Sequence, residues 1–142
     1  MHVREILRDK GAEVVTIPCH ATVVELVRLL SARKIGAAVV LEAEAIAGIA
    51  SERDVVRALA ARGDAALGAA VSEIMSREVV TCVPEDTIHG IMAIMTARRI
   101  RHVPVLEGGR LAGLVSIGDV VKHRLGEIEA EAHLLRDYVT AR

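Results

Sequence analysis

Two copies of one short polar pattern stand out in this sequence, a serine followed three residues later by an aspartate. The copies are Ser51 with Asp54 and Ser116 with Asp119, and each serine follows Gly-x-x at the end of an apolar run. A serine with an acid three residues on can cap a helix by satisfying free backbone amides. A carboxylate beyond a strand end can instead accept hydrogen bonds from the paired hydroxyls of a ribose. The pattern alone leaves both interpretations open.

A second candidate is a group of cationic side chains in the stretch Arg98-Arg99-Ile100-Arg101-His102. Cations stabilise the C-terminal end of a helix, and arginine also binds phosphate through paired donors. Arg53, inside the first Ser-x-x-Asp copy, adds another cation. The corresponding stretch, Arg33-Lys34-Ile35-Gly36-Ala37, is less basic, so we expect the two copies to be unequal.

Motifs of other chemistries are absent from the sequence. The 11 glycines form neither GxGxxG nor GxxxxGK, the six histidines fall at no metal-ligand spacing, and no GxSxG occurs. We therefore expect no catalytic residue and no metal site. An enzyme whose active site carries no recognisable motif remains an alternative.

Composition narrows the class of partner. Of the 142 residues 52% are hydrophobic, which excludes disorder, but Tyr138 is the single aromatic residue, which argues against folds that stack nucleic-acid bases. The formal charge of −1 lacks the one-sign field of a nucleic-acid or membrane-surface protein. We expect small-molecule or protein partners, no nucleic acid and no membrane. Cys19 and Cys82, far apart and outside any CxxC, are expected to be reduced thiols in a cytoplasmic protein.

An internal repeat organises the chain. Residues 14–59 align without a gap onto 79–124 at an offset of 65, with 16 identities in 46 positions. A second, shorter similarity precedes the two copies. The two similar stretches, here called the echo segments, are Val3-Arg4-Glu5-Ile6-Leu7 and Val71-Ser72-Glu73-Ile74-Met75. We expect residues 1–62 to form a first repeat with its N-terminal helix, 63–70 a linker, 71–126 a second repeat and 127–142 a C-terminal helix.

Each copy is predicted to run strand, helix, strand, strand, helix. Apolar and β-branched runs give the strands, and apolar residues at helical spacing give the buried face of the first helix in each copy. The predicted faces are Val23, Val27 and Leu30 in the first copy and Ile88, Ile91, Met92 and Met95 in the second. The expected strands are 14–17, 37–41 and 46–51 in the first copy and 79–83, 102–106 and 111–116 in the second. A second helix begins after each signature serine. The tail at 127–142 carries Ile128, Leu135 and Tyr138 on one stripe, which we interpret as a docking or dimer surface.

The doubled Gly-x-x-Ser-x-x-Asp, the Val-x-Glu-Ile-Met segment and Arg101-His102-Val103-Pro104-Val105 resemble the pair of CBS domains, named for cystathionine β-synthase. The resemblance covers residues 1–126. It implies an α+β fold of two β-α-β-β-α repeats packed with pseudo-two-fold symmetry. It also implies two clefts that bind adenosyl ligands, and a homodimer of pairs.

The resemblance assigns roles by position. Asp54 and Asp119 would take ribose hydroxyls, with Ser51 and Ser116 beside them. The remaining assigned residues would border the adenine or meet phosphates: Thr16, Ile17, Arg53, Thr81, Cys82, Val83, Arg101, His102, Pro104, Ile117 and Gly118. Because Val39 stands where the second copy has Pro104, the first cleft departs from the family pattern.

The function implied is a non-catalytic regulatory module, an energy or redox sensor for an unidentified partner protein. AMP or NAD would be its ligand, with ATP and S-adenosylmethionine also compatible. The alternative is a structural or interaction protein without ligand, in which both Ser-x-x-Asp copies serve only as helix caps.

Overall fold

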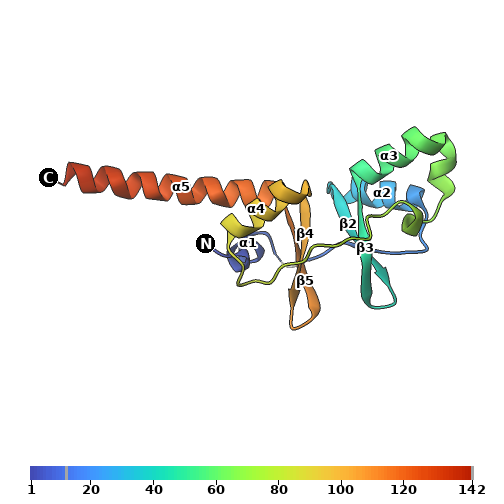
Figure 1. Cartoon of the computed structure of the whole chain (residues 1–142), viewed down its shortest axis with the longest axis horizontal. Coiled ribbons are helices and arrows are strands. Elements are labelled where there is room, and N and C mark those ends of the chain that lie inside the picture. The colour runs from blue at the N-terminus through green and yellow to red at the C-terminus, as the bar shows by residue number, and fades with distance from the viewer. Residues whose placement is uncertain (12, 142) are drawn as a thin grey trace. The chain divides into compact units, whose positions relative to one another are not determined.

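The computed structural model describes residues 1–11 and 13–141, and it consists of helices and small sheets in two compact units (Figure 1). Residues 14–80 form one unit, here called the first-repeat unit. Residues 1–13 together with 81–142 form the other, here called the second-repeat unit. The first contains a β-α-β-β-α repeat, and the second contains an α-β-β-α repeat with a single bridge in place of its first strand, which confirms the mixed fold with two repeats. Two residues inside predicted segments, Ala12 and Arg142, lie outside the described part of the chain.

The first-repeat unit holds a three-stranded sheet in the order β1-β2-β3. Strand β1 (Thr16–Pro18) pairs parallel with β2 (Ala37–Glu42), and β2 pairs antiparallel with β3 (Ala45–Ser51). Helix α2 (Val23–Arg33) provides the crossover between β1 and β2, and α3 (Glu52–Arg62) follows β3 directly. The expected 63–70 linker is the 3-10 helix η1 (Gly63–Gly68), which is followed by η2 (Val71–Glu73).

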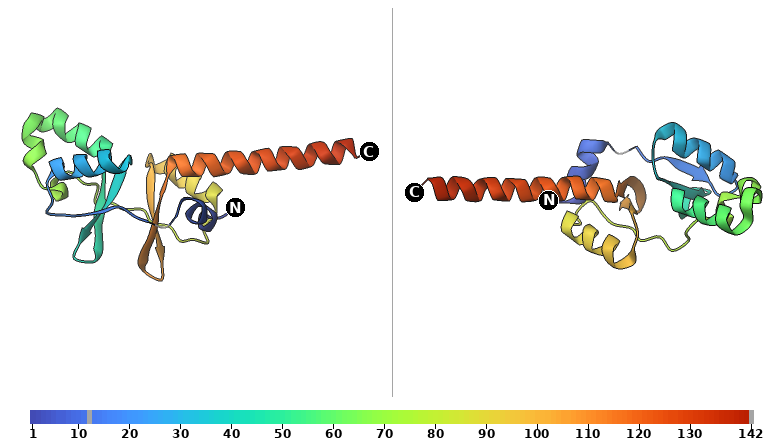
Figure 2. Two further views of the ribbon diagram at one scale, coloured as in Figure 1. Left: turned by 180° about the vertical axis from the view of Figure 1, so that it is seen from behind. Right: turned by 90° about the horizontal axis from the view of Figure 1, so that it is seen from above.

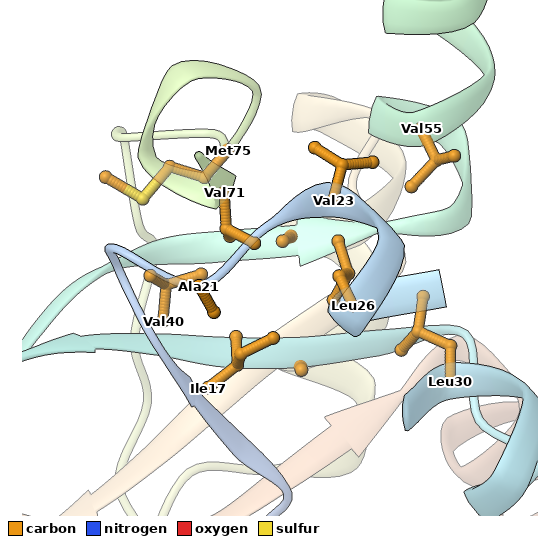
Figure 3. Close-up of a cluster of buried hydrophobic side chains, with 11 residues drawn as sticks. Ile17, Ala21, Val23, Leu26, Leu30, Val40, Val55, Val71 and Met75 are labelled. Carbon is orange, nitrogen blue, oxygen red and sulfur yellow. The ribbon is translucent and has the colours of Figure 1, made fainter. Parts of the chain in front are cut away.

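Aliphatic side chains fill the core of this unit (Figure 3). Helix α2 begins at Thr22, whose hydroxyl accepts from the Glu25 N–H, and it buries Val23, Leu26 and Leu30 against the sheet. The predicted face included Val27, but Val27 is 38% exposed and Leu26 takes its place in the core. Truncating a fully buried leucine such as Leu26 to alanine costs about 2–5 kcal/mol, so this face holds the helix on the sheet.

The second-repeat unit contains α1 (Val3–Lys10), α4 (Ile88–Arg98), β4 (His102–Glu107), β5 (Arg110–Ser116) and α5 (Ile117–Thr140). Strands β4 and β5 form an antiparallel hairpin whose turn contains Gly108 and Gly109, both with positive φ. Residues Ile88, Ile91 and Met95 of α4 are buried as the sequence predicts.

The predicted strand at 79–83 shrinks to one bridge between Cys82 and Val105. In the first copy, the parallel bonds that flank the corresponding position are donated by the Val39 N–H to the Val15 carbonyl and by the Cys19 N–H to the Leu41 carbonyl. The second copy has Pro104 and Pro84 at these two donor positions, and proline has no N–H to donate. The Val83 N–H donates instead to the Asp86 carboxylate at 2.9 Å.

Each echo segment packs on the repeat that is further from it in sequence order. The Val3 N–H donates to the Asp86 carbonyl at 2.9 Å, and the Val71 N–H donates to the Ala21 carbonyl at 2.7 Å. The segment before the first repeat thus serves the second-repeat unit, and the segment before the second repeat serves the first-repeat unit. The boundaries expected from the sequence follow the repeat along the chain, whereas the packing units exchange the two echo segments.

Glycine makes both placements possible. A Cβ at Gly48 would lie 2.6 Å from the Ser76 carbonyl oxygen, so only glycine lets that segment cross β3. A Cβ at Gly113 would collide with the Leu7 side chain of α1. These glycines are the first residues of the two Gly-x-x-Ser-x-x-Asp signatures.

Candidate functional site

The first signature places its carboxylate in a closed network. Ser51 is the N-cap of α3, and its N–H and hydroxyl both donate to Oδ2 of Asp54, at 2.8 and 3.0 Å. The Ser76 hydroxyl donates to Oδ1 at 3.3 Å, and an Arg57 guanidinium nitrogen lies 3.7 Å from the same oxygen. The Asp54 side chain is only 5% exposed. This arrangement is a complete capping box with a further hydroxyl donor.

The second signature is more open and holds a cation. The Ser116 N–H donates to Oδ2 of Asp119 at 2.9 Å, and the Asp119 N–H donates to the Ser116 hydroxyl at 3.2 Å. The Lys10 ammonium donates to the same Oδ2 at 2.7 Å and to the Leu114 carbonyl at 2.9 Å. The Asp119 side chain is 22% exposed, and its Oδ1 accepts in none of these bonds.

Opposing effects act on the pKa of Asp119. Partial burial opposes ionisation, but the hydrogen bonds from Lys10 and Ser116 and the charge of Lys10 outweigh it and hold this pKa below its ordinary value. The carboxylate is therefore ionised at neutral pH. It is a ready acceptor for hydroxyl donors.

Helix α1 brings Lys10 to this carboxylate, and His123 on α5 ties the two helices together. The His123 ring nitrogens lie 2.9 Å from the Asp119 carbonyl oxygen and 2.9 Å from Oδ2 of Asp9. The His123 side chain is 8% exposed and the Asp9 side chain is 66% exposed, so the ring is shielded from solvent but its carboxylate partner is not. Asp9 and Lys10 are neighbours on α1, and the bridge fixes where that helix ends.

The register of the hairpin sets the cationic residues beside the second signature. His102 pairs with Ser116 across β4 and β5, and the Ile117 N–H donates to the Arg101 carbonyl at 2.8 Å. In the first-repeat unit Ala37 takes the place of His102 opposite Ser51. The structure thus brings Arg101 and His102 next to Ser116 and leaves the equivalent place in the first repeat without a cation.

In each unit, the helix that follows the signature serine provides backbone amides at its first residues. Arg53 is exposed in the first turn of α3, and Ile117 and Gly118 occupy the first turn of α5. A helix N-terminus attracts anions through its unpaired N–H groups and its dipole. A shallow groove along α5 begins at Ile117 and Gly118.

The strand-entry residues of the predicted site have mixed accessibility. Thr16 and Thr81 are exposed and Val83 is 43% exposed, whereas the side chains of Ile17, Cys82 and Pro104 are buried. The Cys82 N–H donates to the Pro104 carbonyl at 3.0 Å, and the Cys82 carbonyl accepts from Leu106. Burial raises the pKa of the Cys82 thiol to about 12, with a further contribution from Asp86. This thiol is inert at neutral pH.

Sequence reasoning missed the two groups that reach these carboxylates from other segments, Lys10 and Ser76, and it also missed His123, which links the Asp119 backbone carbonyl to Asp9. Lys10 and Ser76 reach their partners from segments distant in sequence, at separations of 109 and 22 residues. The echo alignment gives no hint, because it sets Ser76 against Arg8 and Lys10 against Glu78. His123 lies four residues after Asp119 on the same helix face, a spacing that could have indicated it.

Within residues 1–11 and 13–141, no group of three or more His, Cys, Asp or Glu side chains is placed to hold a metal ion. In the same part of the chain, no helix has the length and apolar character needed to cross a bilayer.

Comparison with known families decides the family. The CBS domain matches residues 3–61 and again residues 71–126. The chain belongs to the CBS-domain family. Its resemblance to a CBS pair, inferred from the doubled signature, is thereby confirmed.

Solved CBS proteins share the fold. A CBS-domain containing protein from Agrobacterium tumefaciens is 48% identical, with a TM-score of 0.84 over 87% of this chain and 92% of that one. A CBS domain protein from Pyrobaculum aerophilum, complexed with AMP, is 30% identical, with a TM-score of 0.74 over 84% of this chain and 89% of its own.

Among curated proteins, the mitochondrial CBS domain-containing protein CBSX3 of Arabidopsis thaliana is 37% identical over 123 residues, which is 83% of this chain. The match spans 60% of that protein, so the plant relative has substantial sequence outside it.

Proposed function

We propose that this CBS pair is a non-catalytic regulatory module that binds an adenine nucleotide, with its stronger site at the second signature. The observation that carries the proposal is the setting of Asp119, a partly exposed and ionised carboxylate with Arg101 and His102 beside its capping serine. A carboxylate for ribose hydroxyls and cations for phosphate are the two polar features that a nucleotide requires.

In the proposed complex, the ribose hydroxyls donate to Asp119, and phosphate meets Ser116, Arg101 and His102. The adenine lies near Thr81, Val83 and Ile117, against aliphatic rather than aromatic side chains. Val83 and Ile117 leave apolar surface accessible for this contact, and the main chain around Cys82 borders it.

The first signature is proposed to be the weaker site. Asp54, Ser51, Arg53, Thr16 and Ile17 occupy the corresponding positions, but the carboxylate is enclosed by Ser51 and Ser76. A ribose must displace these donors, and no cation replaces Arg101 and His102 there.

AMP is the favoured ligand, because the Pyrobaculum CBS protein of 30% identity is complexed with AMP. NAD shares the adenosine and the first phosphate of AMP, so it fits the same polar groups. ATP shares the adenosine and carries additional phosphates, whereas S-adenosylmethionine shares only the adenosine. Ligand binding would shift the population of conformations of a cytoplasmic homodimer and so change its association with a regulated protein.

A ligand-free interaction protein is the competing function. The complete capping box at Asp54 supports this function, because Ser51 and Asp54 satisfy each other's hydrogen-bonding groups without any ligand. The same interpretation for Asp119 would assign Lys10 as its permanent partner.

Thermal unfolding with AMP, NAD, ATP and S-adenosylmethionine separates the two functions. A ligand at about 100 times its dissociation constant adds roughly 2.7 kcal/mol of stability. For a chain of this size, that corresponds to a rise in Tm on the order of 5–10 °C. Unchanged Tm with all four ligands at millimolar concentration contradicts the proposal.

Matched variants locate the effect. Asp119→Asn should remove the AMP-dependent rise in Tm. The control is Asp137→Asn, because that carboxylate is 64% exposed on α5 and distant in sequence from the signature. Recovery of unaltered nucleotide after incubation tests the absence of catalysis, and a converted nucleotide would show an enzyme instead.

A further inference from the structure

Helix α5 carries a large apolar surface that its own unit does not cover. Its first turns pack beside α1 and α4, where Val120 and His123 are buried, and the rest extends beyond these helices (Figures 1 and 2). Every described residue after Ala132 is exposed, including Leu135 and Val139 at 66% and 67%. A helix segment isolated in water is only marginally stable, so this one requires a partner.

Six apolar residues follow the spacing of a coiled-coil seam. Their separations alternate between four and three residues along the whole helix, which places all of them on one stripe. They are Val121, Leu125, Ile128, Ala132, Leu135 and Val139. The first two also line the shallow groove on α5, so the seam begins inside the second-repeat unit and continues along the extension.

The charges that flank this seam specify both the partner and its direction. In a parallel two-stranded coiled coil, the residue that directly precedes every second seam residue contacts a residue of the other helix whose number is five higher. In this helix the charged preceding residues are Arg124 and Glu131. That rule pairs Arg124 with Glu129 of a second copy, and Glu131 with Arg136 of a second copy. Two-fold symmetry doubles each pair, so all four flanking contacts are attractive. Arg124 also donates to Glu127 of its own helix at 3.2 Å and has donors left over.

Antiparallel arrangements fit less well. An antiparallel helix that covers all six seam residues sets Glu129 against Glu129, Glu131 against Glu131 and Lys122 against Arg136. Sliding it by one heptad restores attractive pairs but leaves two seam residues uncovered, Leu135 and Val139 in one direction or Val121 and Leu125 in the other. Only the parallel, in-register arrangement satisfies the apolar seam and the charges together.

We propose that α5 pairs with α5 of a second copy of this chain in a parallel, in-register, two-stranded coiled coil from Val121 to Val139. The inference uses only the surface of one helix and does not depend on nucleotide binding. Leu134 lies outside the seam and stays at the surface, as single exposed apolar residues commonly do.

Complementary charge variants of the full-length chain test the pairing by analytical ultracentrifugation. Glu131→Arg sets like charges opposite each other in its own homodimer, and Arg136→Glu does the same. Each should weaken self-association on the order of tenfold. A mixture of the two restores both attractive pairs and should dimerise as the wild type does.

An antiparallel coil gives a different result, because Arg136→Glu would then face Lys122 and strengthen its homodimer. A wild-type chain that stays monomeric at 100-micromolar concentration overturns the proposal, and so do two variants that associate as tightly as the wild type.

Cysteine pairing reports direction independently. In a Cys19→Ser background, which leaves only the buried Cys82, Leu135→Cys should form a disulfide-linked dimer under mild oxidation. The matched control is His133→Cys on the outer face of the same helix, which should not. Pairing of Leu135→Cys only with a Leu125→Cys chain, or no pairing at all, contradicts the parallel register.

Discussion

Asp54 and Asp119 hold the same place in two copies of one signature, yet their surroundings differ. The Asp54 side chain is 5% exposed and receives two serine hydroxyls, whereas the Asp119 side chain is 22% exposed and receives a lysine ammonium. The differing partners come from the exchanged segments, because Ser76 follows one echo and Lys10 ends the other. A conserved local pattern can therefore act as a structural cap in one repeat and as a candidate binding group in the next.

The largest expected difference concerns stability. Asp54→Ala leaves the part-buried Ser51 N–H and the Ser76 hydroxyl without their acceptor, so it should lower the free energy of unfolding by about 3 kcal/mol. Asp119→Ala removes a more open cap and should cost about 1 kcal/mol. Urea denaturation of both variants measures the gap. Equal losses would show that the two carboxylates are structurally equivalent.

The two signature glycines give the next contrast. Gly48→Ala drives a methyl group toward the Ser76 carbonyl oxygen and the Met75 sulfur, and the backbone contact should cost about 2 kcal/mol. Gly113→Ala meets only the end of the flexible Leu7 side chain, so repacking should hold its cost below about 1 kcal/mol. Thermal unfolding of the two variants measures which substitution destabilises the protein more. A less stable Gly113→Ala variant would mean that α1 is held more rigidly than its side-chain contact indicates.

For ligand affinity, the second signature should be more sensitive to substitution than the first, which is the reverse of the order expected for stability. Asp119→Asn keeps the shape of the side chain but removes the charge that accepts ribose hydroxyls, so AMP affinity should fall about tenfold or more. Asp54→Asn should change affinity at the stronger site less than about threefold. Calorimetric titration with AMP distinguishes them, and similar losses in the two variants would contradict unequal sites.

Lys10 gives the smallest and most specific contrast, because it donates to Asp119 at 2.7 Å and contributes to the lowered pKa of that carboxyl, whereas the cation beside Asp54, Arg57, lies 3.7 Å from its carboxylate. A lowered pKa in the folded state stabilises the protein at pH values above the ordinary aspartate pKa, and this contribution disappears as pH falls through the lowered value. Wild type should thus exceed Lys10→Met in stability by less than about 1 kcal/mol at pH 6, and the difference should shrink as pH falls through the lowered pKa of Asp119.

The control for this comparison is Arg8→Met, an exposed cation on the last turn of the same helix. Its effect on unfolding should be small and should not follow the titration of Asp119. A pH-independent difference between wild type and Lys10→Met would assign Lys10 to packing rather than to the charge of Asp119.

Local chemistry made most of the fold predictable. The hairpin strands lie within one residue of their expected bounds, and Ser51 and Ser116 cap α3 and α5 as their spacing indicates. The exceptions arise where a distant or unmatched group intervenes. Pro84 and Pro104 cannot donate the bonds that would extend the bridge at Cys82 into a strand, and the helix expected at 127–142 is the continuation of α5 through Gly126.

The sequence predicted where the signature residues lie in the fold, but it did not predict which groups contact them. The register of β4 and β5 brings His102 to Ser116 as the signature implied. Nothing in the echo alignment indicates that Lys10 reaches Asp119, because that contact depends on which repeat α1 packs against. Packing of an amphipathic helix is decided by a complementary surface, here the one opened by Gly113, and such surfaces leave little trace in local sequence.

Because the echo segments are exchanged, the two units are expected to fold in a fixed order during protein synthesis. The first-repeat unit is a continuous piece of chain and is complete once residue 80 has left the ribosome. The second-repeat unit needs both residues 1–13 and residues from 81 onward, so α1 waits with Val3 and Ile6 uncovered until α4 and the hairpin emerge. The enclosed carboxylate of Asp54 is therefore expected to be assembled during translation, and the pairing of Lys10 with Asp119 to be among the last contacts that the new chain makes.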